Sequence, residues 1–120
     1  MKTWQEAWDW AADECAAWNK RDLDAIMLHY ADDVALSSPA VIARMGRADG
    51  WLRGRQEVRD YFALGLQAPN LHFELLDVLL GINTLCVVFR RETGVIVCDV
   101  FELDDQDRVV RLLACYGRQG

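Results

Sequence analysis

The chain has 120 residues, a length typical of one domain, and its 52% apolar and 27% charged side chains are the ordinary balance of a globular protein. We therefore expect a single domain over residues 1–120. The net charge of −6 disfavours a nucleic-acid partner, because binding to phosphates needs lysine and arginine gathered on one surface, and the arginines between residues 44 and 59 are interrupted by acids.

Membrane, metal and disulfide chemistry are disfavoured too. No stretch approaches the ~20 consecutive apolar residues that cross a bilayer, and acids stand near the N-terminus where a secretion signal would carry its apolar segment. The cysteines are scattered singly, without the close pairs of a zinc site, and the two histidines, His29 and His72, are isolated. We expect a cytoplasmic protein with reduced thiols, no metal and no cofactor.

The N-terminal segment predicts a helix over residues 3–20. Thr3, with a glutamate three residues later, has the pattern of a capping box. Trp4, Trp8 and Trp18 recur with smaller apolar residues at steps of three and four. We therefore expect the three tryptophans on one bulky, buried face of this helix.

The following segment alternates between short helices and extended stretches. A second helix is expected from Asp22 to about His29, before a short strand at residues 34–36. Residues 40–53 contain two glycines and mixed charges, so we interpret them as a loop with at most a turn of helix. A third helix is expected over residues 55–67, where apolar residues return at helical spacing.

The C-terminal half is strand-like throughout. Four segments rich in valine, leucine, isoleucine and phenylalanine are separated by short turns, at residues 71–81, 84–92, 95–103 and 108–116. Helices that come first and strands that then follow in succession indicate an α+β fold, with three N-terminal helices packed on a mostly antiparallel sheet.

One strand constrains how the protein assembles. The segment 95–103 is apolar at nearly every position, although a sheet with one wet face should alternate apolar and polar residues. Ile96, Cys98 and Val100 should share one face, and their apolar neighbours the other. We therefore expect both faces to be covered, one by the helices and the other by the sheet of a second copy, which predicts a homodimer.

Six short motifs occur in a fixed order along the chain, at Asn19–Asp24, Tyr30–Val34, Gly54–Phe62, Asp99–Leu103, Arg108–Val110 and Tyr116–Gly117. Their order and spacing resemble the ketosteroid isomerase and SnoaL-like branch of the NTF2-like superfamily, over nearly the whole chain. The resemblance implies an α+β cone, in which a curved sheet wraps around the first helix and leaves a pocket open at one end. It does not define the chemistry, because this fold hosts enzymes and binding proteins alike.

The resemblance carries over only in part to the catalytic positions. In the steroid isomerases of that branch, a carboxylate after the first strand moves the proton, while a tyrosine of the first helix and a protonated aspartic acid stabilise the enolate. Here Asp99 matches the protonated acid, whereas Ser38 replaces the proton-moving carboxylate and Glu14 replaces the tyrosine. Tyr30 matches the position of a supporting tyrosine. We therefore do not expect steroid isomerase activity of the standard kind.

Asp99 is the first candidate for chemistry. Within its strand it shares parity with Val97, Phe101 and Leu103, so it should point where they point. If that face lines the pocket, the apolar surroundings would raise the pKa of the carboxyl group, which could then donate a proton near neutrality. The alternative is an aspartate that a neighbour satisfies or that faces solvent.

Glu14 and Tyr30 are more ambiguous candidates. Glu14 stands at the edge of the tryptophan stripe, between Trp10 and Trp18. It either enters the pocket opposite Asp99 or is an ordinary solvated residue. In the pocket, the pKa values of the two carboxyl groups would move apart, so that one acts as an acid and the other as a base. Tyr30, expected as the last apolar residue of the second helix, either donates its phenol into the pocket or packs in the core.

Two further positions hold polar side chains whose direction is open. Because neighbours on a helix cannot both point straight inward, we expect His29 at the surface or at the dimer contact. Arg90 and Arg91 are adjacent on a strand, so one of them should face inward or toward the partner. An inward arginine would bind an anionic ligand or neutralise Asp99.

The sequence thus favours a pocket for a small hydrophobic molecule, with Asp99, Glu14 and Tyr30 as candidate catalytic residues for cofactor-free isomerisation, cyclisation or dehydration. The side chains expected to contact the substrate are Trp18, Ser38, Phe62, Phe89, Val97, Leu112, Ala114 and Tyr116. The alternative is a non-catalytic ligand-binding or dimeric interaction module, which the serine at position 38 favours. Epoxide hydrolysis needs an Asp/Arg/Asp arrangement around a water, for which the sequence offers only Asp99 and Arg91.

Overall fold

The computed structural model describes residues 1–118. Over this range the helices are α1 (Trp4–Asn19), α2 (Leu23–Met27), α3 (Pro39–Met45) and α4 (Arg55–Gly65), and the strands are β1 (Tyr30–Ser37), β2 (Trp51–Arg53), β3 (Phe73–Gly81), β4 (Thr84–Arg91), β5 (Ile96–Leu103) and β6 (Val109–Tyr116).

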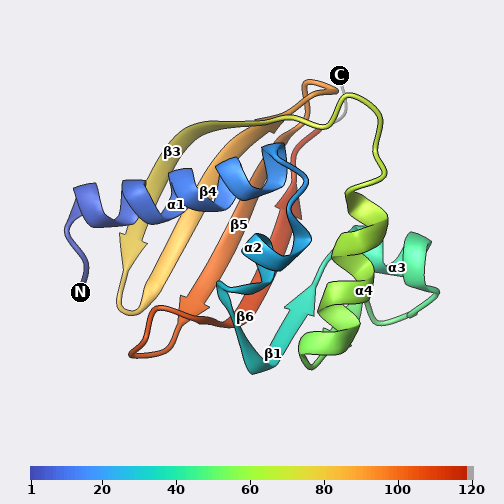
Figure 1. The fold of residues 1–120 in the computed structure, drawn as a ribbon, viewed down its shortest axis with the longest axis horizontal. Helices are drawn as coiled ribbons and strands as arrows, with labels where there is room; N and C mark the ends of the chain where they lie inside the picture. Colours follow the sequence, from blue (N-terminus) through green and yellow to red (C-terminus); the bar gives the residue numbers. More distant parts are fainter. Residues whose placement is uncertain (119–120) are drawn as a thin grey trace.

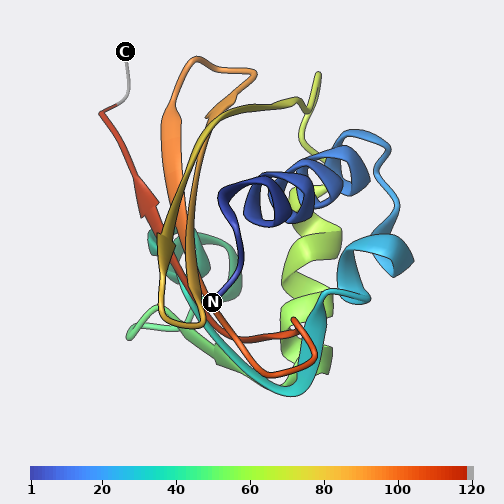
Figure 2. The ribbon, with the colours of Figure 1, turned by 90° about the vertical axis from the view of Figure 1, so that its left-hand side faces the viewer.

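The strands form one bent sheet in the order β2-β1-β6-β5-β4-β3. All neighbours are antiparallel except β1 and β6, which are parallel. Figures 1 and 2 show α1, α2 and α4 together on the concave side of the sheet, with α1 lying across the strands and α4 beside β1. The predicted α+β cone of helices on a curved, mostly antiparallel sheet is therefore confirmed, and the sheet remains open between its edges β2 and β3.

The first helix begins as its sequence predicts. The Glu6 amide donates a 3.1 Å hydrogen bond to Thr3 Oγ1, and the Thr3 amide donates one of 2.9 Å to the Glu6 carboxylate. The expected burial of all three tryptophans is wrong for Trp4, which is 51% exposed and stacks on Trp8. The reason is that the first turn of α1 projects beyond β3 at the edge of the sheet (Figure 1). Only Trp18 lies fully inside.

The chain leaves the second helix earlier than expected. Helix α2 ends at Met27, and Tyr30 already pairs with Val109 as the first residue of β1. The Val109 amide donates a 2.7 Å hydrogen bond to the His29 carbonyl, which draws this segment into the sheet. The expectation that Tyr30 closes a helix is therefore wrong, because the pairing with a distant strand overrides the local pattern.

The segment expected to be a loop contains two elements. Ser38 caps α3, accepting a 3.1 Å hydrogen bond from the Ala40 amide, and Pro39 follows it in the first turn, where its missing donor costs nothing. Strand β2 then pairs antiparallel with β1, with Ser37 opposite Trp51. Residues 40–53 thus extend the sheet and place a helix beside its end.

The two faces of β5 have different surroundings. Val97, Phe101 and Leu103 point to the concave side and are buried. Ile96, Cys98 and Val100 point to the convex side and are only partly buried, although they are in the middle of the sheet. The convex face therefore keeps the apolar character on which the prediction of a homodimer rests.

Candidate functional site

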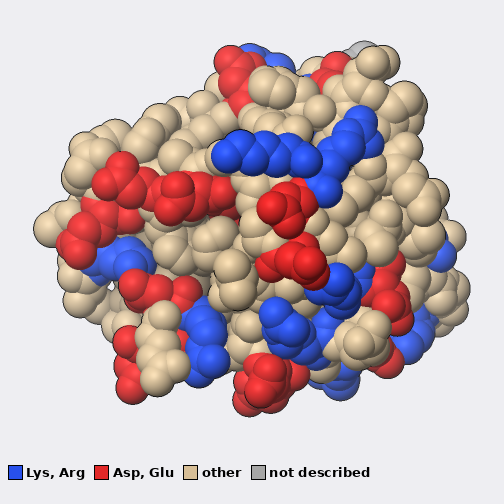
Figure 3. All heavy atoms as spheres, viewed as in Figure 1, with Lys and Arg blue, Asp and Glu red and all other residues tan. Residues whose placement is uncertain are grey.

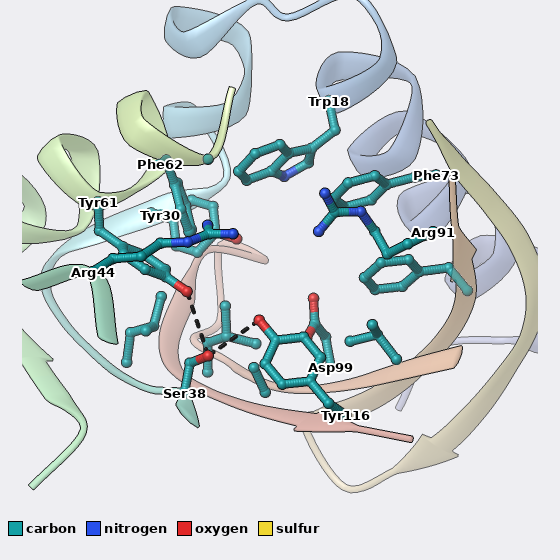
Figure 4. Close-up of a pocket in the computed structure, with 16 residues that line it drawn as sticks. Trp18, Tyr30, Ser38, Arg44, Tyr61, Phe62, Phe73, Arg91, Asp99 and Tyr116 are labelled. Carbon is teal, nitrogen blue, oxygen red and sulfur yellow. Dashed lines mark hydrogen bonds between the residues drawn. The ribbon is translucent and has the colours of Figure 1, made fainter. Parts of the chain in front are cut away.

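A cavity of about 60 Å³ lies between the concave face of the sheet and the helices α1 and α4 (Figure 4). Its wall is formed by Trp18, Tyr30, Leu36, Ser38, Arg44, Tyr61, Phe62, Gly65, Phe73, Phe89, Arg91, Val97, Asp99, Leu112, Ala114 and Tyr116. The volume is enough for a few waters or for one functional group of a ligand. All residues that the sequence placed at the substrate are in this wall, as are Asp99 and Tyr30, whereas Glu14 is not.

Aromatic rings hold the apolar part of the wall in shape. Trp18 stacks on Phe73 with ring centres 5.1 Å apart, and Phe73 stacks on Phe89 at 4.5 Å. Phe62 meets Trp18 edge to face at 5.0 Å and Tyr30 at 5.2 Å. Such contacts restrict rotation of the rings, so the cavity is largely preformed.

Asp99 is the acid of this wall. It pairs with Val87 and Ala114 in the middle of the sheet and points to the concave side, into the cavity (Figure 4). Burial and then the charge of Glu14 raise the pKa of its carboxyl group to about 8, and the charge of Arg91 opposes them. Because the side chain faces a cavity instead of bulk water, the raised pKa favours the protonated form of Asp99 at neutral pH, which can donate a hydrogen bond.

Glu14 lies behind Tyr30, buried to 4% exposure. Its Oε1 atom accepts a 3.0 Å hydrogen bond from the Tyr30 hydroxyl and a 3.3 Å hydrogen bond from Trp18 Nε1. Glu14 therefore does not face Asp99 across an open space. It acts on the cavity through its charge and through the phenol that it holds.

His29 contacts the other oxygen of Glu14. The distance from His29 Nδ1 to Glu14 Oε2 is 2.7 Å, with an angle poor for a hydrogen bond, and the ring packs at 5.2 Å from Trp10. The interaction with Glu14 raises the pKa of His29 against the effect of burial. The expectation of His29 at the open surface is therefore wrong, because the turn between α2 and β1 directs the imidazole toward Glu14 and leaves 21% of the side chain exposed. A role at the dimer contact stays a prediction.

Three hydroxyl groups form a row on the opposite wall. Tyr61 donates to Ser38 Oγ at 3.4 Å, and Ser38 donates to the Tyr116 hydroxyl at 3.2 Å (Figure 4). Burial raises the pKa of Tyr61 to about 12, so its hydroxyl acts as a neutral donor and acceptor. Ser38 directly follows β1 and caps α3, so a hydroxyl stands where the resemblance places the proton-moving carboxylate.

Two arginines lie at the mouth of the cavity. Arg44 comes from α3 and Arg91 from the end of β4, and they reach toward the centre from opposite sides (Figure 4). Both also line an outer chamber of about 630 Å³. Arg91 is thus the inward-facing member of its pair, while Arg90 binds Glu74 on the exposed side at 2.9 Å.

Some wall residues were missed by sequence reasoning. Arg44 lies in the segment interpreted as a loop, and only the recognition of α3 would have directed it inward. Phe73 and Leu36 could have been found, because each has the strand parity of a buried neighbour. Tyr61 precedes Phe62 on α4, and the helical wheel gave no reason to prefer its hydroxyl for the site.

Three observations concern possible metal, membrane and polyanion contacts. Within residues 1–118 no group of three histidine, cysteine or acidic side chains could hold a metal ion. No helix in this part of the chain is long and apolar enough to span a bilayer. On the face shown in Figure 3, basic side chains alternate with acidic ones, so that face offers no continuous basic surface to a polyanion.

Comparison with known proteins identifies the family. Residues 11–112 match the SnoaL-like domain, so the chain belongs to the SnoaL-like domain family. A SnoaL-like protein of unknown function from Burkholderia thailandensis E264 shares 36% identity and a TM-score of 0.91, covering 97% of this chain and 98% of that one. Among curated proteins no match is found.

More distant solved structures share the fold. One, provisionally described as a polyketide cyclase from Sinorhizobium meliloti, has 16% identity and a TM-score of 0.73, over 89% of this chain and 94% of that one. Another, provisionally described as a ketosteroid isomerase from Kribbella flavida DSM 17836, has 15% identity and a TM-score of 0.70, over 90% of this chain and 75% of that one. At these identities the likeness shows the NTF2-like fold and no more.

Proposed function

We propose that this protein binds a small apolar carbonyl compound and catalyses cofactor-free proton transfer on it, with Asp99 as the acid. The observation that carries the proposal is the Asp99 carboxyl group, which faces an aromatic cavity with a pKa of about 8. A neutral carboxylic acid beside a carbonyl oxygen lowers the energy of the enol that forms when a neighbouring carbon loses its proton.

The proton from carbon needs a second group, and Tyr30 with Glu14 offers one. In the proposed step the Tyr30 oxygen accepts the proton from carbon while its own proton moves to Glu14 Oε1, 3.0 Å away. Asp99 delivers its proton to the carbonyl oxygen, which gives a neutral enol, an ionised Asp99 and a protonated Glu14. In the second half of the reaction Glu14 returns a proton through Tyr30 to the same or another carbon, and the enol hydroxyl returns its proton to Asp99. Tyr30 and Asp99 are thus the groups that touch substrate, and Glu14 acts through Tyr30.

The alternative is a binding protein without catalysis, and one observation favours it. Both oxygens of Glu14 are already in contact with Tyr30 or His29, and Asp99 is the one acid in the cavity wall formed by the described residues. A ligand would then receive a hydrogen bond from Asp99 without losing a proton.

Two related molecules separate these functions. 2-Tetralone is an apolar ketone with exchangeable α-protons, and 2-naphthol has the shape of its enol. We expect wild type to bind 2-naphthol in calorimetry and to speed deuterium incorporation into 2-tetralone in D₂O. Asp99→Ala should weaken 2-naphthol binding about tenfold or more, the usual cost of losing a hydrogen bond to a charged or polarised group.

Glu102→Gln is the matched control, because Glu102 is on the same strand and points to the convex face, where it meets Arg111 at 3.4 Å. Glu102→Gln should bind 2-naphthol and speed deuterium incorporation into 2-tetralone as wild type does. Binding of 2-naphthol without deuterium exchange would support the binding protein instead of the enzyme. If wild type and Asp99→Ala bind 2-naphthol equally, Asp99 has no role in the pocket and the proposal fails.

We also propose that the convex face joins two copies of the chain. Cys86, Cys98 and Cys115 lie together on it, with Cys98 opposite Cys115, and Val100 adds a partly exposed apolar surface. Sedimentation should show a dimer for wild type and a monomer for Val100→Lys, with Ala16→Lys, at an exposed position of α1 away from the convex face, as control. A wild-type monomer at micromolar concentration would contradict the proposal. A cytoplasmic location and independence from cofactors stay predictions.

A further inference from the structure

We infer that the pocket selects ligands with a carboxylate group beside an apolar body, and that Arg44 and Arg91 bind this carboxylate at the neck of the cavity. The inference rests on the proposed function, because it names the class of molecule that would occupy the same pocket. It assigns a role to two side chains that the proposed proton transfer does not use.

The two arginines define a neck between two spaces. The inner cavity of about 60 Å³ and the outer chamber of about 630 Å³ share Arg44, Arg91, Val97 and Tyr116. In Figure 4 the guanidinium groups of Arg44 and Arg91 extend toward each other from opposite walls. A ligand that reaches Asp99 from the outer chamber therefore passes between two positive charges.

Arg44 has its donors available. It forms no ion pair with the acids of residues 1–118, although Arg47, on the loop that follows α3, binds Glu57 at 2.7 Å. A Cβ atom added at Gly65 would lie 3.6 Å from Arg44 Nη1, which shows that the guanidinium group reaches across to α4. An arginine that extends over a cavity without an acidic partner is suited to bind a carboxylate from outside.

Arg91 is held in a fixed direction, and only some of its hydrogen-bond donors are used. Its Nε and Nη2 atoms donate to the Glu92 carboxylate at 2.9 and 3.1 Å, which leaves Nη1 for another acceptor. The guanidinium group also lies 4.9 Å from the centre of the Phe73 ring. These contacts fix the direction of Arg91 and weaken its positive charge, so Glu92 moderates the affinity of the neck for anions.

The surroundings explain why an anion with an apolar part fits best. The outer chamber is lined on its apolar side by Pro39, Ala40, Ala68, Pro69 and Val95. Deeper in, the raised pKa of Asp99 favours its neutral form, which does not repel a carboxylate at the neck. Because the whole chain carries a net charge of −6, these two arginines provide a local attraction that the rest of the protein does not.

A charged and a neutral form of one molecule test the inference. We would measure the binding of 2-naphthoate and 2-naphthamide by calorimetry at low ionic strength. Wild type should bind 2-naphthoate at least about tenfold more tightly than 2-naphthamide, the range expected for charge-assisted hydrogen bonds. Arg44→Gln and Arg91→Gln should each lower the affinity for 2-naphthoate about fivefold to tenfold and leave that for 2-naphthamide unchanged.

The controls come from the neighbouring arginines. Arg47→Gln and Arg90→Gln remove the same net charge outside the pocket, so both should bind 2-naphthoate nearly as wild type does. Glu92→Gln should bind it more tightly, because Arg91 is released. Arg91→Lys keeps the charge and should retain part of the preference, which guards against a glutamine variant that fails to fold.

Each result has a separate meaning. If 2-naphthoate and 2-naphthamide bind equally tightly, the carboxylate inference is overturned while the proposed pocket stands. An equal loss in Arg90→Gln and Arg91→Gln would overturn it too, because net charge alone would explain the loss. If 2-naphthol, 2-naphthoate and 2-naphthamide all fail to bind, the proposed function and the inference fall together.

Discussion

The Tyr30 hydroxyl donates its single proton to Glu14 Oε1, 3.0 Å away, so the phenol presents only oxygen lone pairs to the cavity. This relationship connects a buried charge with the site. Glu14 raises the pKa of Tyr30, after burial, and contributes to the raised pKa of Asp99. A carboxylate that does not touch the cavity thereby influences the two side chains proposed to act in it.

Removing the charge of Glu14 should lower the pKa of Asp99. In Glu14→Gln the repulsion between the two carboxylates is lost, so the ionised form of Asp99 becomes easier to reach. A carboxyl-carbon NMR titration measures the shift. Asp13→Asn is the control, because Asp13 is the exposed neighbour on α1 and should leave the pKa of Asp99 in place. An unchanged pKa in Glu14→Gln would show that burial alone sets it.

Asp99 should make the protein less stable as the pH rises. The folded state keeps the Asp99 proton up to about pH 8, whereas the ordinary value is 3.8, so folding binds a proton between these pH values. Stability therefore falls with rising pH across that range and becomes level above it. Asp99→Asn removes this dependence.

Thermal unfolding of Asp99→Asn and wild type at several pH values measures the difference. The free energy of unfolding of Asp99→Asn, relative to that of wild type, should rise on the order of a few kcal/mol between about pH 5 and about pH 9. Glu102→Gln should follow wild type over the same range. A constant difference between Asp99→Asn and wild type would mean that Asp99 titrates near its ordinary value.

His29 should stabilise the fold in its protonated form. Its contact with Glu14 raises the pKa of the imidazole above 6.5, so its contribution is complete below that pH and is lost as the pH rises through the folded value. His29→Gln should therefore cost more stability at about pH 5.5 than at about pH 9. His72→Gln, at an exposed position, should cost little at either pH. An equal cost of His29→Gln at both would indicate a role in packing only.

Cys15 should resist modification in the folded protein. Burial raises the pKa of its thiol to about 12, and the side chain is 5% exposed, so almost no thiolate is available. A thiol reagent at about pH 8 should modify Cys15 only after unfolding. Cys15→Ser should therefore leave the fast phase of the reaction unchanged. A smaller fast phase in Cys15→Ser would contradict its burial.

The fold was predictable because its signals are local. The turns between the last four strands are visible in the sequence, and strand parity within β5 alone predicted the side to which Asp99 points. The pairing of Tyr30 with Val109 was not predictable in this way, because it joins segments far apart in the chain. Local spacing favoured helix there, and tertiary pairing decided otherwise.

The site was predictable only where a strand or a long helix carries it. Trp18 and Phe62 follow from helical spacing, and Leu112 from strand parity. The inward direction of His29 and of Arg44 depends on how short segments pack against the sheet. The spacing of apolar residues in the sequence does not predict this packing. Only the packed structure shows that Glu14 lies behind Tyr30 and does not line the cavity.

The pKa of Asp99 tests the central claim most directly. A titration of its carboxyl carbon by NMR, assigned with Asp99→Asn, should give a value near 8, because burial and Glu14 both favour the neutral form. A value near 8 would support a pocket acid that is ready to donate at neutral pH. An ordinary value close to 3.8 would contradict the account, because Asp99 would then be an ionised, hydrated side chain that could not act as the acid.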